Sequence, residues 1–205
     1  MGKITEISVQ KNNKERANLY IDGEFYSGIS IETAYNMRLK VGDEIENQTL
    51  LKVIEEDDKQ RAFIKAVDYI SRAIKTKKQV KDYLVKKGFS VEIAYYVIDK
   101  LKDYGYIDDK EYAKSYVEST SKTQGKRLVA FKLMQKGVKK EDIEVAYSER
   151  DEEIDRENAK LLAEKRLKNK EKTKENLMKT YKYLIGRGFS YEQADYAISS
   201  FREGD

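Results

Sequence analysis

The chain has 205 residues, of which 38% are charged, and it contains no His, Cys, Trp or Pro. A Cys/His zinc site, a His-dependent catalytic triad and a Cys nucleophile are therefore excluded, and no disulfide can form. No apolar run approaches the roughly 18 to 20 residues of a membrane span, and the start of the chain lacks the apolar core of a signal peptide. We expect a soluble, cytoplasmic protein.

The net charge of +4 is distributed unevenly. Residues 1–57 hold 7 basic and 11 acidic side chains, a balance of −4, whereas residues 58–205 hold 34 and 26, a balance of +8. The positive field therefore belongs to the C-terminal part of the chain. Such a high charged fraction leaves little apolar material for one thick core, which favours small elements in series.

The first segment reads as strands, because residues 3–27 alternate between apolar and polar side chains. Asp22-Gly23 lies between two such runs and favours a type I′ hairpin turn, in which both central positions have positive φ. A short helix over 31–37 is expected next. These elements predict a β-rich N-terminal module over residues 1–57.

Beyond Asp57 the apolar spacing changes from two to between three and four, which predicts helices. A segment of basic residue, glycine and helix start recurs as Lys86-Lys87-Gly88-Phe89-Ser90, loosely as Gln135-Lys136-Gly137-Val138-Lys139, and as Gly186-Arg187-Gly188-Phe189-Ser190. The three glycines stand 49 and 51 residues apart. A period of about 50 residues is typical of stacked supersecondary units that share a binding face.

Each repeat resolves into three helices. In the first, Thr76 and Gln79 form a capping-box signature for the middle helix, which is expected to stop at Gly88, and Ser90 is placed as the N-cap of the third helix. The predicted fold is mainly α: three tandem three-helix repeats over 58–108, 109–150 and 151–205 in an elongated array, preceded by the β-rich module over 1–57.

The middle helix of every repeat, with its approach, is basic. The candidate binding residues are Arg72, Lys75, Lys77, Lys78, Lys81 and Lys87 in the first strip, Lys122, Lys126, Arg127, Lys132 and Lys136 in the second, and Lys165, Arg166, Lys168, Lys172, Lys174, Lys179, Lys182 and Arg187 in the third. If equivalent helices stack on one side, these strips join into a positive track for a polyanion or an acidic groove. The alternative is that the lysines only decorate solvated helix faces.

Motifs for chemistry are weak. Gly186-Arg187-Gly188 begins a dinucleotide-loop pattern, but Tyr191 stands where the third glycine belongs. Asp108-Asp109 could hold a metal, yet an Asp before a helix is the usual N-cap, and we expect capping. Tyrosines among lysines can stack on bases, but their helical spacing favours packing. No catalytic residue, metal or cofactor is expected.

The block Gly105-Tyr106-Ile107-Asp108-Asp109-Lys110-Glu111-Tyr112-Ala113, with the basic helix stops at glycine, resembles the RecX family of bacterial recombination regulators. The resemblance extends to Arg72, to Lys122-x-x-Gly125-x-Arg127-Leu128 and to Lys136-Gly137-Val138. The hairpin with Asp22-Gly23-Glu24 resembles the extension of Gram-positive members, so nearly the whole chain is covered. Lys132 departs from the pattern, because family members often carry an acid there.

The resemblance implies a non-enzymatic regulator that binds the RecA nucleoprotein filament, RecA plus single-stranded DNA, along its groove. It implies inhibition of the recombinase, ATPase and co-protease activities of RecA, and hence a part in DNA repair, recombination and the SOS response. We expect a monomer with weak direct contact to DNA and no membrane partner. The alternative function is direct, sequence-nonspecific DNA binding; a metal-dependent nuclease acting through Asp108 or Asp109 is a third class that we do not expect.

Overall fold

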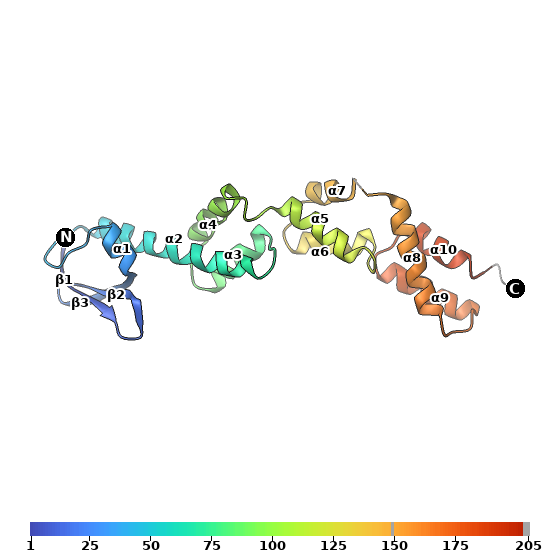
Figure 1. Cartoon of the computed structure of the whole chain (residues 1–205), viewed down its shortest axis with the longest axis horizontal. Helices are drawn as coiled ribbons and strands as arrows, with labels where there is room; N and C mark the ends of the chain where they lie inside the picture. The colour runs from blue at the N-terminus through green and yellow to red at the C-terminus, as the bar shows by residue number, and fades with distance from the viewer. Residues whose placement is uncertain (149, 203–205) are drawn as a thin grey trace. The chain divides into compact units, whose positions relative to one another are not determined.

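The computed structural model describes residues 1–148 and 150–202; Glu149 and the last three residues of the predicted third repeat lie outside the described part. Four strands near the N-terminus form an antiparallel sheet in the order β3-β2-β1-β4; Figure 1 labels β1, β2 and β3. They are β1 Gly2–Gln10, β2 Asn13–Ile21, β3 Glu24–Ser30 and β4 Glu44–Ile45, and α1 Ile31–Asn36 follows β3. The β2–β3 turn has φ of 50° at Asp22 and 87° at Gly23, which confirms the predicted hairpin.

Helix α2, Asn47–Ser71, begins inside the segment that the sequence assigned to the β-rich module. Leu50 and Val53 of this helix pack with Ile4, Leu19 and Ile29 of the strands to form the core beneath the sheet. The expectation that helical spacing starts only beyond Asp57 is therefore wrong. The helical face before that point consists of few apolar residues between charged ones, so its period was hard to see. The predicted limit after residue 57 falls within α2, and the domain limits remain predictions.

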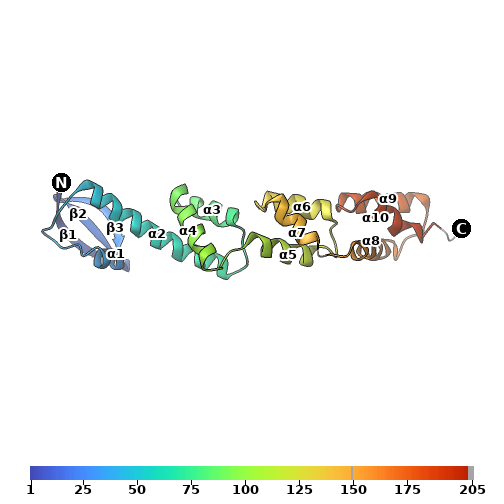
Figure 2. The same cartoon turned by 90° about the horizontal axis from the view of Figure 1, so that it is seen from above.

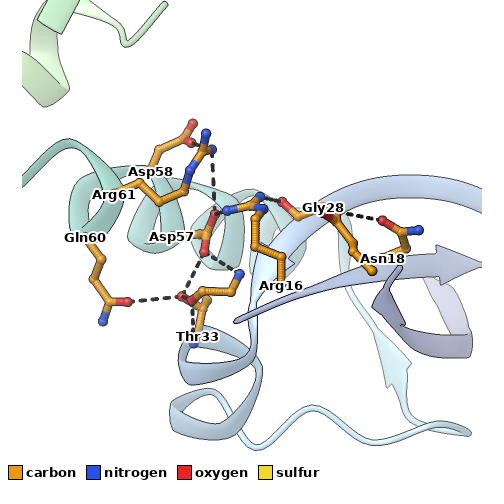
Figure 3. Close-up of polar contacts among 10 residues, drawn as sticks. Arg16, Asn18, Gly28, Thr33, Asp57, Asp58, Gln60 and Arg61 are labelled. Atoms are coloured by element: carbon orange, nitrogen blue, oxygen red, sulfur yellow. Dashed lines mark hydrogen bonds and ion pairs between the residues drawn. The ribbon is translucent and has the colours of Figure 1, made fainter. Parts of the chain in front are cut away.

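A buried carboxylate fastens α2 to the sheet (Figure 3). Asp57 is 1% exposed; it accepts a hydrogen bond from the backbone N–H of Ser30 at 2.6 Å and pairs with Arg16 at 3.3 Å. The Thr33 hydroxyl lies 3.2 Å from the same carboxylate, and Arg16 also donates to the Gly28 carbonyl. A buried charge is tolerated when it is paired and hydrogen-bonded, so this network holds β2, β3, α1 and α2 at one point.

The chain forms two compact units. The first comprises Met1–Arg72 with Lys81–Leu101, and the second comprises Ala73–Val80 with the chain from Lys102 onward. The remaining helices are α3 Lys77–Lys86, α4 Val91–Asp103, α5 Asp109–Thr120, α6 Lys126–Gln135, α7 Lys140–Ser148, α8 Glu152–Leu167, α9 Lys174–Gly186 and α10 Tyr191–Ser199 (Figure 2). The sets α2–α4, α5–α7 and α8–α10 confirm a mainly α fold with three three-helix domains after a small sheet.

The helix stops and caps follow the sequence closely. Gly88, Gly137 and Gly188 have φ of 91°, 87° and 90°, the left-handed conformation that ends a helix at little cost for glycine. Thr76 and Gln79 exchange both capping-box hydrogen bonds, as do Ser190 and Gln193. The predicted stop at Gly88 and the predicted capping box of Thr76 and Gln79 are confirmed, as is Ser90 at the start of α4, where its hydroxyl accepts from the Ile93 N–H at 3.3 Å.

Separate apolar cores hold the second and third repeats together. The second core contains Tyr112, Ala113, Val117, Val129, Leu133, Val138, Ile143 and Tyr147, and the third contains Ala159, Ala163, Leu184, Phe189, Ala194 and Ala197. Three helices of nine to sixteen residues suffice for each core. Within the described ranges, no helix combines the length and apolar character needed to cross a membrane.

Candidate functional site

The middle helix of each repeat ends in a segment that we call its glycine corner: residues 87–90, 136–139 and 187–190. At the first junction the corner of repeat 2 receives the start of α3. The Thr76 hydroxyl donates to the Lys136 carbonyl at 2.6 Å, and Lys78 Nζ donates to the Gln135 carbonyl at 2.9 Å. A Cβ on Gly137 would lie 2.5 Å from the Cβ of Lys78, so this close approach requires glycine.

The second junction repeats this arrangement one repeat later. The backbone N–H of Gly125, the N-cap of α6, donates to the Arg187 carbonyl at 2.9 Å, and that of Arg127 donates to the Gly188 carbonyl at 3.1 Å. A Cβ on Gly125 would overlap the backbone nitrogen of Phe189. The N-terminus of one middle helix thus meets the C-terminus of the next, an arrangement that pairs opposite ends of two helix dipoles.

The glycine corners therefore do more than end helices. The sequence predicted helix stops, which the structure confirms, but it did not reveal the second role of Gly137 and Gly188 as contact points between repeats. One signal was available: Gly125 stands at an N-cap where the equivalent residues of the other repeats are Thr76 and Thr173. Because threonine caps a helix with its side chain and glycine cannot, a glycine at this position indicates a close backbone neighbour that leaves no room for a side chain.

The third basic strip gathers where α8 ends and the loop to α9 begins. Lys165, Lys168, Lys170 and Lys172 line a surface hollow of about 580 Å³, in which Glu164 is the one acidic residue among the described lining residues. Lys165 also lines a second hollow of about 380 Å³ with Arg166 and Arg187. Five of the eight residues predicted for this strip are thus brought together, and their like charges form a local positive field suited to an anion.

Two arginines of this strip share one aromatic ring. The guanidinium carbons of Arg166 and Arg187 lie 4.2 Å and 5.1 Å from the ring centroid of the half-buried Tyr183. These cation–π contacts orient both guanidinium groups. The other strip residues lie outside the two hollows; Lys179 pairs with Glu175 at 2.6 Å, and this hydrogen bond lowers the pKa of the Glu175 carboxyl.

The second strip is more dispersed. Lys126 and Arg127 are exposed and line a hollow at the junction of repeats 2 and 3. Lys132 Nζ donates to Gln124 at 2.7 Å, and Lys136 lies over the Tyr116 ring. Lys122 is exposed. Intramolecular contacts thus engage part of this strip, including the residue at which the sequence departs from the family pattern.

The first strip is likewise divided among several contacts. Arg72 pairs with Asp68 at 2.8 Å, and Lys78 serves the first junction. Lys81 and Lys87 lie over tyrosine rings, whereas Lys75 and Lys77 are half-buried. The continuous positive track that the sequence predicted remains a prediction.

Cations over aromatic rings were not predicted from the sequence. Among the described residues, such contacts are made by Lys81, Lys87, Lys126, Lys136, Arg166, Lys172 and Arg187. Tyr83–Lys87 and Tyr183–Arg187 are the same pair, four residues apart, in repeats 1 and 3. This spacing places both side chains on one helix face and was the signal available in the sequence.

The Asp108-Asp109 pair has structural partners. Asp108 caps α5 by accepting from the Lys110 N–H at 2.7 Å, as predicted. Asp109 is 7% exposed and accepts from the Lys77 N–H at 3.0 Å, so it belongs to the first junction. Among the described residues, no group of three or more acidic side chains could hold a metal ion.

Fold and surface together define a class of protein: small three-helix domains in tandem after an antiparallel sheet, with cationic surfaces and polar contacts between backbones at the junctions. Family models match the chain over four segments. The regulatory protein RecX N-terminal domain matches residues 2–46, and the first, second and third three-helix domains of RecX match 62–101, 108–146 and 153–198. The chain belongs to the RecX family.

Relatives and solved structures agree with this assignment. The chain is 38% identical over 196 residues to regulatory protein RecX of Clostridium botulinum strain Alaska E43, covering 94% of this chain and 92% of the relative. It is 32% identical to that of Clostridium tetani, over 100% and 97% of the two chains. A crystal structure of regulatory protein RecX superposes with a TM-score of 0.70 at 26% identity, covering 99% of this chain and 100% of the other. The crystal structure of RecX from Lactobacillus salivarius superposes with a TM-score of 0.64 at 28% identity, covering 72% of this chain and 98% of the other.

Proposed function

We propose that this protein is a non-enzymatic regulator that binds RecA nucleoprotein filaments along their groove and inhibits RecA. The observation that carries the proposal is the cluster of Lys165, Lys168, Lys170 and Lys172 around one hollow, in a chain of a regulatory family. Regularly placed cations can follow a groove lined by acidic side chains and phosphates. Membership in a family named for regulation supports a role without catalysis.

Several cations of the surface are held in place before any partner binds. Arg166 and Arg187 are fixed over Tyr183, which reduces the side-chain entropy lost on binding. The junctions join the repeats through backbone and side-chain hydrogen bonds, so the second and third repeats present their cations from one compact unit. Both features favour recognition of an extended partner.

The test is to measure ATP hydrolysis and strand exchange by the host RecA with and without this protein. We expect both activities to fall as the protein is added to preformed filaments, with saturation at a fixed ratio to RecA. Unchanged activities at saturating concentration would reject the proposal. A rise in either activity would mean that the protein stimulates RecA. That result would reject inhibition but not binding to the filament.

Direct, sequence-nonspecific DNA binding is the second candidate, and the cationic hollows of repeat 3 favour it. Such binding releases counterions, so the affinity for naked single-stranded DNA would fall steeply with salt, with a slope that counts the phosphate contacts. We expect affinity for the filament to exceed affinity for the same naked DNA at every salt concentration. Equal affinities would favour the DNA-binding alternative.

A further inference from the structure

Two surface hollows occupy equivalent positions in repeats 2 and 3. The hollow of repeat 2, about 580 Å³, lies between the start of α6 at Lys126 and the end of α7 at Tyr147. The hollow of repeat 3, about 650 Å³, lies between the start of α9 at Lys174 and the end of α10 at Ile198. Tyr147 and Ile198 each stand ten residues after the corner glycine of their repeat.

The two hollows differ in what closes them. In repeat 2 the following repeat supplies one wall, through Gly188 and Ser190 of its glycine corner, Gln193 of α10 and Asp155 of α8. In repeat 3 all the lining residues come from repeat 3 itself, among them Met178, which is 51% exposed. The surface between the start of the middle helix and the end of the third helix is thus partly covered by a glycine corner in repeat 2 and is left open in repeat 3.

The start of α9 carries the capping residue that binds a corner elsewhere. Thr173 caps α9 and precedes Lys174, as Thr76 caps α3 and precedes Lys77. The position of Lys78 is held in α9 by Glu175, whose carboxylate pairs with Lys179 at 2.6 Å. In α3 the threonine caps its helix and also donates its hydroxyl to the carbonyl of a glycine corner. Thr173 is exposed, so its hydroxyl is accessible for the same contact.

One glycine corner is also left uncovered. Gly88-Phe89-Ser90 in repeat 1 has the same three residues as Gly188-Phe189-Ser190, the corner that docks inside the chain. The place of a Cβ on Gly88 has nothing within 4 Å, and both Gly88 and Ser90 are exposed, whereas Gly188 is buried. Repeat 1 therefore exposes a glycine corner that no middle-helix start contacts in the described part of the chain.

The helix ends at the two open surfaces carry opposite partial charges. At both internal junctions the positive N-terminal end of a middle helix faces the negative C-terminal end of the next, and at the first junction Lys78 also donates to a carbonyl at the end of α6. The junctions pair the start of α3 with the end of α6, and the start of α6 with the end of α9. The C-terminus of α3 and the N-terminus of α9 are thus the two middle-helix ends left without such a partner in the described part of the chain, and they carry opposite partial charges.

We propose that the hollow of repeat 3 receives the Lys87–Ser90 corner of a second copy of this chain, so that copies associate head to tail. The contact is heterologous, and successive copies would form an open chain. A contact of one hollow with one corner buries less than about 1,200 Å², so the association is weak and depends on concentration. This proposal differs from the monomer expected from the sequence, and it concerns the protein alone, without RecA or DNA.

The chain lacks cysteine, so site-specific cross-linking tests the proposal directly. The Lys87→Cys and Lys174→Cys variants are mixed in equal amounts and treated with a short bismaleimide, and the cross-linked dimer is measured on a denaturing gel. Both side chains are exposed, and the Thr173 cap is left intact. A mixture of Lys140→Cys with Lys174→Cys is the matched control, since Lys140 is an exposed lysine outside the corner.

We expect several-fold more dimer from the first mixture than from the control, rising with protein concentration. Adding Met178→Glu to the Lys174→Cys chain should reduce the dimer to the control amount, because a carboxylate would face the corner carbonyls. Met134→Glu, at an equally exposed methionine of α6, should leave the yield unchanged. Equal yields from the two mixtures, or a yield that Met178→Glu does not lower, would overturn the proposal whether or not the protein regulates RecA.

Discussion

The backbone N–H of Gly125 donates a hydrogen bond to the carbonyl of Arg187 across 2.9 Å and so joins the second repeat to the third. Gly125 has φ of −77°, a conformation open to any residue. Glycine is needed there for another reason: a Cβ would overlap the backbone of Gly188 and Phe189. The constraint is therefore the contact between repeats and not the local turn.

Gly125→Ala should destabilise the protein by about 1–3 kcal/mol, the usual cost of forcing an extra carbon into a packed contact. Gly186→Ala is the matched control, because the Cβ there would have nothing within 4 Å. The control should be neutral or stabilising by up to about 1 kcal/mol, since alanine favours a helix. Urea unfolding followed by circular dichroism measures both. Equal stability of the two variants would refute the role of Gly125.

Asp57→Asn should cost about 3–5 kcal/mol of unfolding free energy, because it leaves Arg16 without its buried partner. Asp58→Asn, at a one-third exposed carboxylate paired with Arg61, should cost less than about 1 kcal/mol. Amide hydrogen exchange at Ser30, whose N–H donates to Asp57, should accelerate in the first variant and not in the second. Unchanged exchange at Ser30 would show that the network does not hold the sheet on α2.

Much of the architecture could be predicted from local signals. Capping boxes, helix-stopping glycines and the Asp22-Gly23 turn depend on residues close in sequence, and the structure confirms them. The start of α2 was missed because its buried face before Asp57 includes only Leu50 and Val53 as apolar residues. Two apolar residues among many charged ones are too few to show a helical spacing.

The junctions could not be predicted in the same way. Their hydrogen bonds link positions some 60 residues apart, such as Thr76 with Lys136, and most of them use backbone carbonyls that carry no sequence signature. The basic strips were visible as composition, but which lysines are exposed and which bind carbonyls, carboxylates or rings depends on the tertiary structure. Lys78 and Lys132 illustrate this, since both have intramolecular acceptors.

Tyr147→Phe should be nearly neutral at pH 7, because the Tyr147 hydroxyl is buried and has no hydrogen-bond partner in the described part of the chain. Burial first, and then the Asp155 carboxylate, raise the pKa of this hydroxyl, while Arg150 lowers it in part. A raised pKa favours the protonated form in the folded state. The contribution of this hydroxyl to the free energy of unfolding is therefore fully present below pH 10, about the pKa of tyrosine in the unfolded chain. It is lost as pH rises above that value, by up to about 1.4 kcal/mol per pH unit.

Unfolding free energies of the wild type and Tyr147→Phe, measured between pH 9 and pH 11, test this assignment. The wild type should lose stability relative to the variant as pH rises, since phenylalanine cannot ionise. Tyr35→Phe, at a tyrosine that is 82% exposed, should follow the wild type at every pH. Parallel curves for wild type and Tyr147→Phe would contradict the burial argument.

Replacement of Lys165, Lys168 and Lys170 together by glutamine should weaken binding to preformed RecA filaments about tenfold. These residues line one hollow of repeat 3. None of them lines the neighbouring hollow proposed for self-association, which shares Lys172 and Phe201 with the first, so the variant leaves the lining of that second hollow intact. The estimate takes about 0.5 kcal/mol for each neutralised exposed charge, which sums to roughly one factor of ten. The control replaces Lys11, Lys14 and Lys40, exposed lysines of the N-terminal module, and changes the net charge by the same amount. Anisotropy titrations at two salt concentrations measure the affinity of both variants for the filament and separate a local contact from a general charge effect. If the contact is local, only the first variant loses affinity. Equal losses in both variants would mean that the third strip is a solvated face and that its clustering serves no partner.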